Sequence, residues 1–130
     1  MAKILVIEDD STMLLNLVEM LEFENYTALG ARSGQEGLAL VEADPPDLIL
    51  CDVMLPDIDG FEVVQTLRAD PSHARIPVIF ISARARSVSG DRVPQAGVIS
   101  YVMKPFDVQD LLNTIRGVLN SDHQDVGHNA

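Results

Sequence analysis

The chain has few positive charges. Nine lysines and arginines stand against twenty aspartates and glutamates, and the net charge is -11 at pH 7. This imbalance argues against direct binding to nucleic acid, because proteins bind phosphate backbones through Lys and Arg. It argues equally against binding to an anionic membrane surface. We interpret most of the acidity as a contribution to solubility, to which acids gathered around a divalent cation would add.

The chain also lacks long apolar runs, internal repeats and linker-like segments, and it has one cysteine. No stretch approaches the roughly 20 apolar residues that span a membrane. Cys51 has no partner for an internal disulfide and lies in a short apolar run, so we interpret it as a small core residue in a reducing, cytoplasmic environment. The length predicts one domain over 3–119. The polar residues 120–130 are expected to form a disordered tail or the start of a linker.

Short apolar runs alternate with segments of helical periodicity along the chain. This pattern is typical of a parallel sheet with helices on both faces and right-handed crossovers. Strands are predicted over 4–7, 26–29, 48–52, 77–82 and 99–103. Helices are predicted from Thr12 to Glu22, after a capping box at Ser33–Glu36, after Asp59, and from Asp107 to Leu119. Between the last two strands, Gly90 and Pro94 lower helix propensity, and we expect a short or mobile helix over 84–97.

Polar groups of different kinds follow the predicted strands. Glu8 and Asp9 follow the first strand, Asp52 ends the third, Ser82 ends the fourth and Lys104 follows the fifth. Parallel strands end at one edge of the sheet, where open α/β proteins place their sites. Carboxylates gathered there would repel, by about 4 kcal/mol at 4 Å and an effective dielectric of 20. A divalent cation removes the conflict, and oxygen ligands favour Mg²⁺, with Mn²⁺ as the alternative ion.

Such a site suits phosphoryl chemistry. A carboxylate oxygen of Asp52 could attack phosphorus and form an aspartyl phosphate. Mg²⁺ and Lys104 would neutralise charge on the transferring group, and the hydroxyl of Ser82 could bind one of its oxygens. Because the charge of the site would change on modification, the arrangement is typical of a switch.

With these residues in view, the sequence resembles the response regulator receiver domain of two-component signalling, in particular chemotaxis-type regulators. The resemblance runs from Lys3 to about Leu119. It implies a flavodoxin-like, doubly wound (βα)5 fold. The motifs that resemble the family are Ile4-Leu5-Val6-Ile7-Glu8-Asp9-Asp10, Asp52-Val53-Met54-Leu55-Pro56-Asp57-Ile58-Asp59-Gly60, Ile81-Ser82-Ala83 and Tyr101-Val102-Met103-Lys104-Pro105-Phe106.

The resemblance implies a role for each residue of the site. Asp52 would be the phosphoacceptor. Asp9 would bind Mg²⁺ directly, Glu8 would bind it through water, and the backbone carbonyl of Met54 would complete the protein's share of the ligands. Glu8 departs from the family pattern, in which Asp is commoner.

The same resemblance assigns the switching residues. Ser82, a variant of the commoner Thr, would be the switch hydroxyl, and Tyr101 the switch aromatic that moves between outward and inward positions. Lys104 would pair with the phosphoryl group, and its bond to Pro105 is typically cis in the family. The donor would be a phosphohistidine on a sensor histidine kinase or a phosphotransfer protein. The output would be an effector protein, or a second copy of the chain in a homodimer, at the face of the fifth strand and last two helices.

Three alternatives remain open. A pseudo-receiver would bind partners without phosphorylation. A Mg²⁺-dependent phosphatase, which would make the protein an enzyme, could use Asp57-Ile58-Asp59-Gly60 as an acid-x-acid nucleophile loop. A flavin-binding electron carrier is disfavoured because Glu8-Asp9-Asp10 would repel a phosphate where such carriers bind one. Three histidines, at His73 in a predicted loop and at His123 and His128 in the tail, are not expected to bind metal or phosphate.

Overall fold

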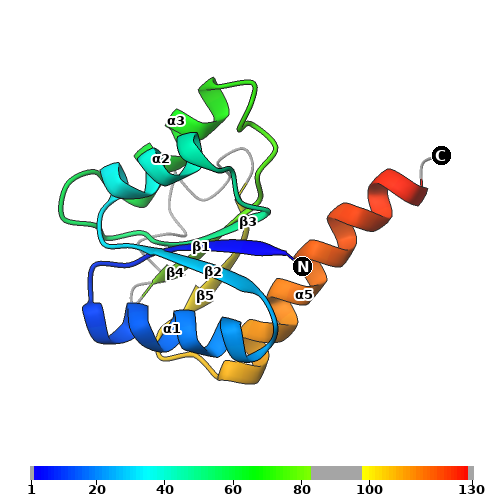
Figure 1. Cartoon of the computed structure of the whole chain (residues 1–130), viewed down its shortest axis with the longest axis horizontal. Helices are drawn as coiled ribbons and strands as arrows, with labels where there is room; N and C mark the ends of the chain where they lie inside the picture. Colours follow the sequence, from blue (N-terminus) through cyan, green and yellow to red (C-terminus); the bar gives the residue numbers. More distant parts are fainter. Residues whose placement is uncertain (1, 83–97, 129–130) are drawn as a thin grey trace.

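Five parallel strands form one sheet in the order β2-β1-β3-β4-β5 (Figure 1). The structure is a computed structural model that describes residues 2–82 and 98–128. This strand order is flavodoxin-like, with a switch point between β1 and β3, and it confirms the predicted fold class. The strands are β1 (Lys3–Ile7), β2 (Thr27–Ala31), β3 (Leu48–Asp52), β4 (Val78–Ser82) and β5 (Val98–Met103).

Helices cover both faces of the sheet. Figure 1 shows α2 and α3 on one side and α1 and α5 on the other. The described helices are α1 (Ser11–Phe23), α2 (Gly34–Ala43), α3 (Gly60–Ala69) and α5 (Val108–His128). The short or mobile helix predicted over 84–97 lies outside the described residues. In the part of the chain that the structure describes, no helix has both the length and the apolar character needed to cross a bilayer.

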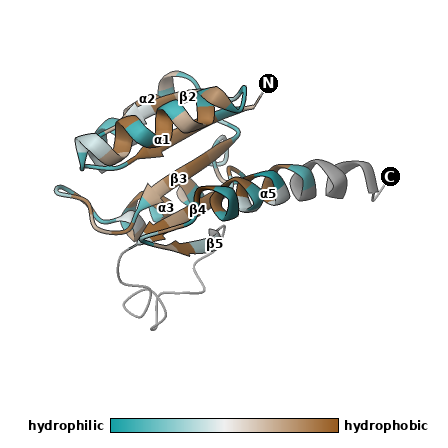
Figure 2. Ribbon diagram, turned by 90° about the horizontal axis from the view of Figure 1, so that it is seen from below, coloured by the Kyte–Doolittle hydropathy of each residue, from teal (hydrophilic) through white to brown (hydrophobic). Residues whose placement is uncertain are grey.

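The central strands are buried on both faces, which explains their continuous apolar runs. Alternate residues of β3 pack into two separate cores. Ile49 and Cys51 contact the core under α2 and α3, whereas Leu48 and Leu50 contact the core under α1 and α5. The hydropathy colours of Figure 2 show these apolar strands between more polar helices. Burial, reinforced by the nearby charge of Asp52, raises the pKa of the Cys51 thiol, so this side chain is a protonated core residue.

Two helix starts with similar sequence signals differ in their hydrogen bonds. Asp59 and Glu62 form a complete capping box at α3, with side-chain-to-backbone distances of 2.9 and 3.2 Å. At α2, Ser33 Oγ accepts a hydrogen bond from the amide of Glu36 at 3.1 Å. The carboxylate of Glu36, however, accepts from Arg32 N at 2.7 Å. The predicted box at Ser33 is therefore half formed, because the Glu36 side chain reaches the amide that precedes the cap.

Helix α5 is longer than the sequence predicted. It was expected to end near Leu119, followed by a disordered tail over 120–130, but its backbone is helical to His128. The predicted boundary rested on the polar composition after Asn120. Polar residues do not by themselves stop a helix, and residues 120–128 contain no proline, the strongest helix breaker.

Gly60, the first residue of α3, lies against the end of β3. A Cβ atom at this position would be 2.8 Å from the carbonyl oxygen of Asp52 and 3.0 Å from Val53 Cα. Because both neighbours are backbone atoms, we expect Gly60→Ala to lower the free energy of unfolding by about 1–3 kcal/mol. Urea denaturation tests this. Gly117→Ala is the matched control, because nothing lies within 4 Å of a Cβ there and helix propensity favours alanine. Equal stability of Gly60→Ala and wild type would contradict the packing argument.

Candidate functional site

The ends of β1, β3, β4 and β5 bring polar residues to one edge of the sheet. The parallel register pairs Ile7 with Cys51 and Asp52 with Ile81, so the residues that follow lie side by side. Glu8, Asp52 and Ser82 are buried there, with exposed fractions of 1%, 5% and 3%. Buried carboxylates are costly unless they are paired, so their partners decide what the site can do.

Lys104 joins the two buried carboxylates. Its Nζ lies 2.7 Å from Glu8 Oε1 and 3.0 Å from Asp52 Oδ2. The Lys104 amide donates a hydrogen bond to Ser82 O at 2.7 Å, which positions the backbone of the lysine. The peptide bond from Lys104 to Pro105 is cis, as the resemblance implied. The lysine thus reaches both acids from the far side of β4.

Backbone amides bind the remaining oxygen of each acid. Glu8 Oε2 accepts a hydrogen bond from Asp10 N at 3.1 Å, and Asp52 Oδ1 accepts one from Met54 N at 3.0 Å. Each buried carboxylate therefore has one oxygen on Lys104 and one on a backbone N–H. This arrangement orients both carboxylates and offsets the cost of their burial.

Burial and hydrogen bonding shift the pKa of Glu8, and likewise the pKa of Lys104, in opposite directions. Burial raises the pKa of Glu8 above its ordinary value, despite its hydrogen bonds to Lys104 and Asp10. Burial also opposes the charge of Lys104, but the hydrogen bonds to Glu8 and Asp52 outweigh it and raise the pKa of the lysine. Lys104 is therefore a fixed positive charge at neutral pH.

One lysine does not balance the acids of this site. One carboxylate oxygen from each of Glu8, Asp9 and Asp52 can be chosen so that the three lie within 4.8 Å of one another, with Asp9 exposed to solvent. Three ionised carboxylates and one ammonium leave two uncompensated negative charges. An oxygen-only ligand set with this charge fits a hard divalent cation, which could enter from the exposed side of Asp9.

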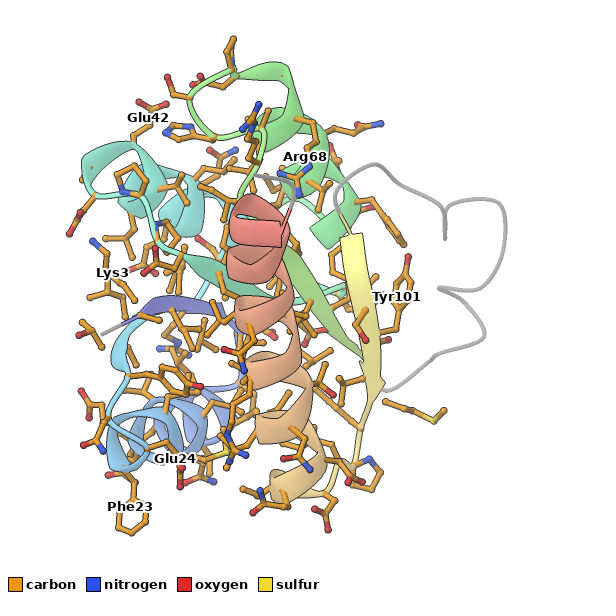
Figure 3. The ribbon with its side chains drawn as sticks, turned by 90° about the vertical axis from the view of Figure 1, so that its right-hand side faces the viewer. Lys3, Phe23, Glu24, Glu42, Arg68 and Tyr101 are labelled. Carbon is orange, nitrogen blue, oxygen red and sulfur yellow. The ribbon has the colours of Figure 1, made fainter. Side chains whose placement is uncertain are left out.

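The other predicted residues surround this centre. Tyr101 lies in β5 opposite Phe80 in the strand register, and the two ring centroids are 5.5 Å apart. Figure 3 shows Tyr101 beside β5 at the edge of the sheet. Ser82 ends the neighbouring strand. Met54 contributes its amide to Asp52, while its side chain is exposed. The functional roles of these residues stay predictions.

Sequence reasoning missed the role of Asp57 in the loop after β3. Its carboxylate accepts hydrogen bonds from Gly34 N at 2.9 Å and Gln35 N at 2.8 Å. Desolvation opposes its charge, but these two amides lower the pKa of Asp57 below its ordinary value. The contact ties the loop to the start of α2. No local signal could have found it, because the partners are 22 and 23 residues away.

The same contacts argue against the phosphatase alternative. In an acid-x-acid nucleophile loop, the first acid should follow a buried strand directly and face the substrate. Here Asp57 binds the amides at the start of α2, and Asp59 caps α3. The acid that does end a buried strand is Asp52.

The fold and the site define a doubly wound α/β protein with an acidic, lysine-paired centre at the carboxyl ends of its strands. The family of response regulator receiver domains matches residues 4–116. Protein PilH of Pseudomonas aeruginosa is 34% identical over 119 residues, which cover 92% of this chain and 98% of PilH. The polar-differentiation response regulator DivK of Brucella abortus is 34% identical over 116 residues, covering 89% of this chain and 94% of DivK. The chain belongs to the response regulator receiver domain family.

Solved structures agree with this assignment. A CheY-like response regulator receiver domain protein from Methanospirillum hungatei has a TM-score of 0.86 at 30% identity, with 96% of this chain and 98% of that chain covered. The receiver domain of a sensor histidine kinase from Pseudomonas aeruginosa has a TM-score of 0.82 at 29% identity, with 92% and 98% covered. That domain holds a magnesium ion coordinated in its active-site cleft.

Proposed function

We propose that Asp52 accepts a phosphoryl group from a phosphohistidine of a sensor histidine kinase or phosphotransfer protein, in a Mg²⁺-dependent reaction. Asp52 is a buried carboxylate at the end of a central strand, paired with Lys104 and surrounded by further acids. Family membership supports the reaction class, because receiver domains are signalling switches of two-component systems.

Each residue of the site has a separate role in the proposed phosphoryl transfer. A carboxylate oxygen of Asp52 forms the new bond to phosphorus while the bond from phosphorus to the donor imidazole nitrogen breaks, and that nitrogen keeps the electron pair. Met54 N–H orients the attacking carboxylate. Lys104 moves from pairing two carboxylates to pairing the phosphoryl oxygens. Glu8, Asp9, Asp52 and the carbonyl of Met54 would hold Mg²⁺, which supplies positive charge to the transferring group when bound.

The experiment that tests the function is intact-mass spectrometry after incubation with acetyl phosphate. We expect one phosphoryl adduct in Mg²⁺, a similar adduct in Mn²⁺ and none with a chelator in excess. The chelator sample is the matched control, because only the divalent cation differs. Absence of any adduct in Mg²⁺ would overturn the proposal and favour the pseudo-receiver, which binds partners regardless of phosphorylation.

The output is proposed to pass through Ser82 and Tyr101. Ser82 ends β4 at the same edge of the sheet as Asp52. The Tyr101 ring packs on the ring of Phe80, which lies two residues before Ser82 on β4. We propose that the Ser82 hydroxyl moves towards a phosphoryl group on Asp52 and that the Tyr101 ring responds. The affected face would include β5 and α5. The short or mobile helix predicted over 84–97, which the family resemblance adds to this face, lies outside the described residues. An effector protein or a second copy of the chain would read this face.

Removing the Ser82 hydroxyl should separate phosphorylation from switching. We expect Ser82→Ala to accept the phosphoryl group but to lose most of the phosphorylation-induced shift of the Tyr101 ring signals in NMR spectra. The protein has two tyrosines, so Tyr26 serves as an internal reference. Ser100→Ala, on the neighbouring strand, is the matched control and should keep the Tyr101 shift. An undiminished shift in Ser82→Ala would contradict the role of this hydroxyl.

We further infer that the protein works in the cytoplasm as a modified switch and not as an enzyme with a diffusible product. The acidic composition and the free, buried thiol of Cys51 support this inference.

A further inference from the structure

His73 is a buried polar residue that the phosphorylation site does not use. Among the described residues, the buried polar or charged side chains are Glu8, Asp52, Ser82 and His73. The first three lie at the carboxyl ends of the strands. His73 lies in the turn between α3 and β4, at the opposite edge of the sheet, with an exposed fraction of 6%. The sequence placed it correctly in a loop but did not predict its burial or its neighbours, and these neighbours lead us to depart from the expectation that His73 binds no metal.

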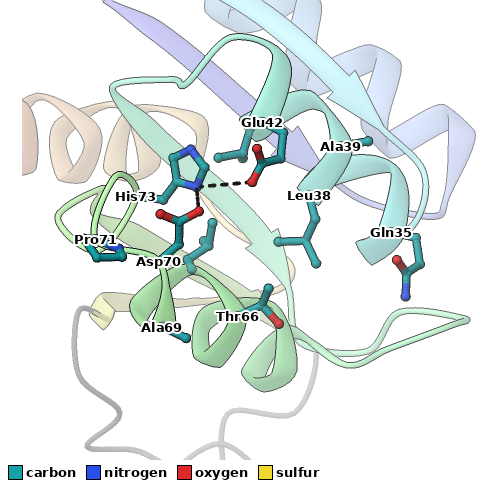
Figure 4. Close-up of a pocket in the computed structure, with 11 residues that line it drawn as sticks. Gln35, Leu38, Ala39, Glu42, Thr66, Ala69, Asp70, Pro71 and His73 are labelled. Carbon is teal, nitrogen blue, oxygen red and sulfur yellow. Dashed lines mark ion pairs between the residues drawn. The ribbon is translucent and has the colours of Figure 1, made fainter.

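Two carboxylates from different elements converge on the His73 imidazole (Figure 4). Nδ1 lies 3.3 Å from Oδ2 of Asp70, which caps the end of α3, and 3.9 Å from Oε2 of Glu42, in the last turn of α2. One ligand atom from each of the three residues can be chosen so that all lie within 4.8 Å of one another. These residues line a cavity of about 590 Å³ between α2 and α3.

We propose that Glu42, Asp70 and His73 form a second metal site, selective for a Zn²⁺-type transition-metal ion. Imidazole is a ligand that suits zinc and its neighbours, whereas an oxygen-only set suits Mg²⁺. Two ligands bound at about 2.0–2.1 Å to a tetrahedral ion are about 3.4 Å apart. The separation of 3.3 Å between His73 Nδ1 and Asp70 Oδ2 fits this geometry. The cavity gives water access to the fourth position.

Part of the site is held in place by contacts that need no metal. Asp70 Oδ1 accepts a hydrogen bond from Ser72 N at 2.9 Å, so Oδ2 is the oxygen that faces His73. His73 N donates to Asp70 O at 2.9 Å. Arg68 donates to Ile76 O at 2.8 Å, which fixes the turn to the end of α3. Such outer contacts orient ligands and tune metal affinity.

Glu42 is the adjustable ligand. Its side chain is 71% exposed, so a rotamer change can shorten the distance of 3.9 Å to the imidazole without disturbing the core. A metal bound by all three residues would cross-link the ends of α2 and α3, two helices that otherwise meet through side-chain packing. Metal binding to the folded state alone would then stabilise the protein.

The competing interpretation is a direct contact between the His73 imidazole and the two acids, without a metal. Calorimetric titration with Zn²⁺ in excess Mg²⁺ distinguishes the two, because Mg²⁺ competes for the oxygen-only acids around Asp52 and does not suit the imidazole site. We expect one Zn²⁺ to bind wild type and to raise its Tm. Glu42→Gln and His73→Gln should each weaken Zn²⁺ binding by at least about 10-fold, since even outer-shell changes cost about 10–100-fold.

Two control variants complete the experiment. Glu19→Gln removes an exposed acid from α1, and His123→Gln removes a histidine that is not one of the three proposed ligands. Both should bind Zn²⁺ as wild type does. Because Glu42 is exposed, Glu42→Gln keeps the test decisive even if His73→Gln fails to fold. Absence of Zn²⁺ binding to wild type, unchanged affinity in Glu42→Gln, or loss of binding in either control would overturn the proposal.

Discussion

Replacing Asp52 with asparagine is expected to abolish the phosphoryl adduct completely. The amide nitrogen or oxygen of asparagine is a poor nucleophile, and the substitution keeps the size of a side chain that is 8% exposed. The Asp52→Asn variant should therefore fold, because the amide oxygen of the new side chain could still accept the hydrogen bond from Met54 N. Intact-mass spectrometry with acetyl phosphate and Mg²⁺ measures the result as presence or absence of one added phosphoryl group.

The matched control is Asp57→Asn. Asp57 is an acid in the loop that follows β3, five residues after Asp52, but its carboxylate is exposed and accepts hydrogen bonds from the amides of Gly34 and Gln35. We expect this variant to be phosphorylated as wild type is, because its side chain points to α2 and not to Lys104. A persistent adduct on Asp52→Asn, or a lost adduct on Asp57→Asn, would place the acceptor elsewhere.

Replacing Lys104 with alanine is expected to have the largest effect on stability. The lysine side chain is 18% exposed and is paired with two carboxylates that are more deeply buried. Its removal leaves Glu8 and Asp52 as uncompensated charges facing each other. Breaking a buried pair in this way costs about 3–5 kcal/mol. Urea denaturation in metal-free buffer measures the loss, and we also expect no stable phosphoryl adduct.

Magnesium should restore part of the stability lost in Lys104→Ala. A bound dication compensates the same acids and binds the folded state. Lys3→Ala is the matched control, because Lys3 pairs with Asp44, whose side chain is 69% exposed. An exposed pair of this kind is worth about 0–1 kcal/mol. If metal-free Lys104→Ala were as stable as wild type, the pair would not be the element that stabilises this edge of the sheet.

Much of the site could be predicted because strand ends are visible in the sequence. Short apolar runs end at Ile7, Asp52 and Ser82, and parallel strands place their ends on one edge. The kinds of side chain at those ends then indicated an acidic centre with one lysine. The parallel topology by itself brings these residues together, whatever the exact distances between them.

Contacts between elements could not be predicted in the same way. The bond of Asp57 to the start of α2, and the approach of Glu42 to His73, join residues that are far apart in the chain. Neither pair belongs to a repeating pattern. Their meeting depends on how α2 and α3 pack side by side on the sheet, which is set by side-chain shape across the whole core.

The sequence by itself determined the parallel (βα) architecture and the edge of the sheet that holds the site. It also determined that acids, among them Asp52, and one lysine, Lys104, follow the strands at that edge. Periodic burial and strand direction are local properties, so they can be inferred from local patterns. Only the tertiary structure decided that Lys104 binds Glu8 and Asp52 together and that His73 is buried between two acids. These depend on distances between elements, and such distances follow from the packing of the complete core.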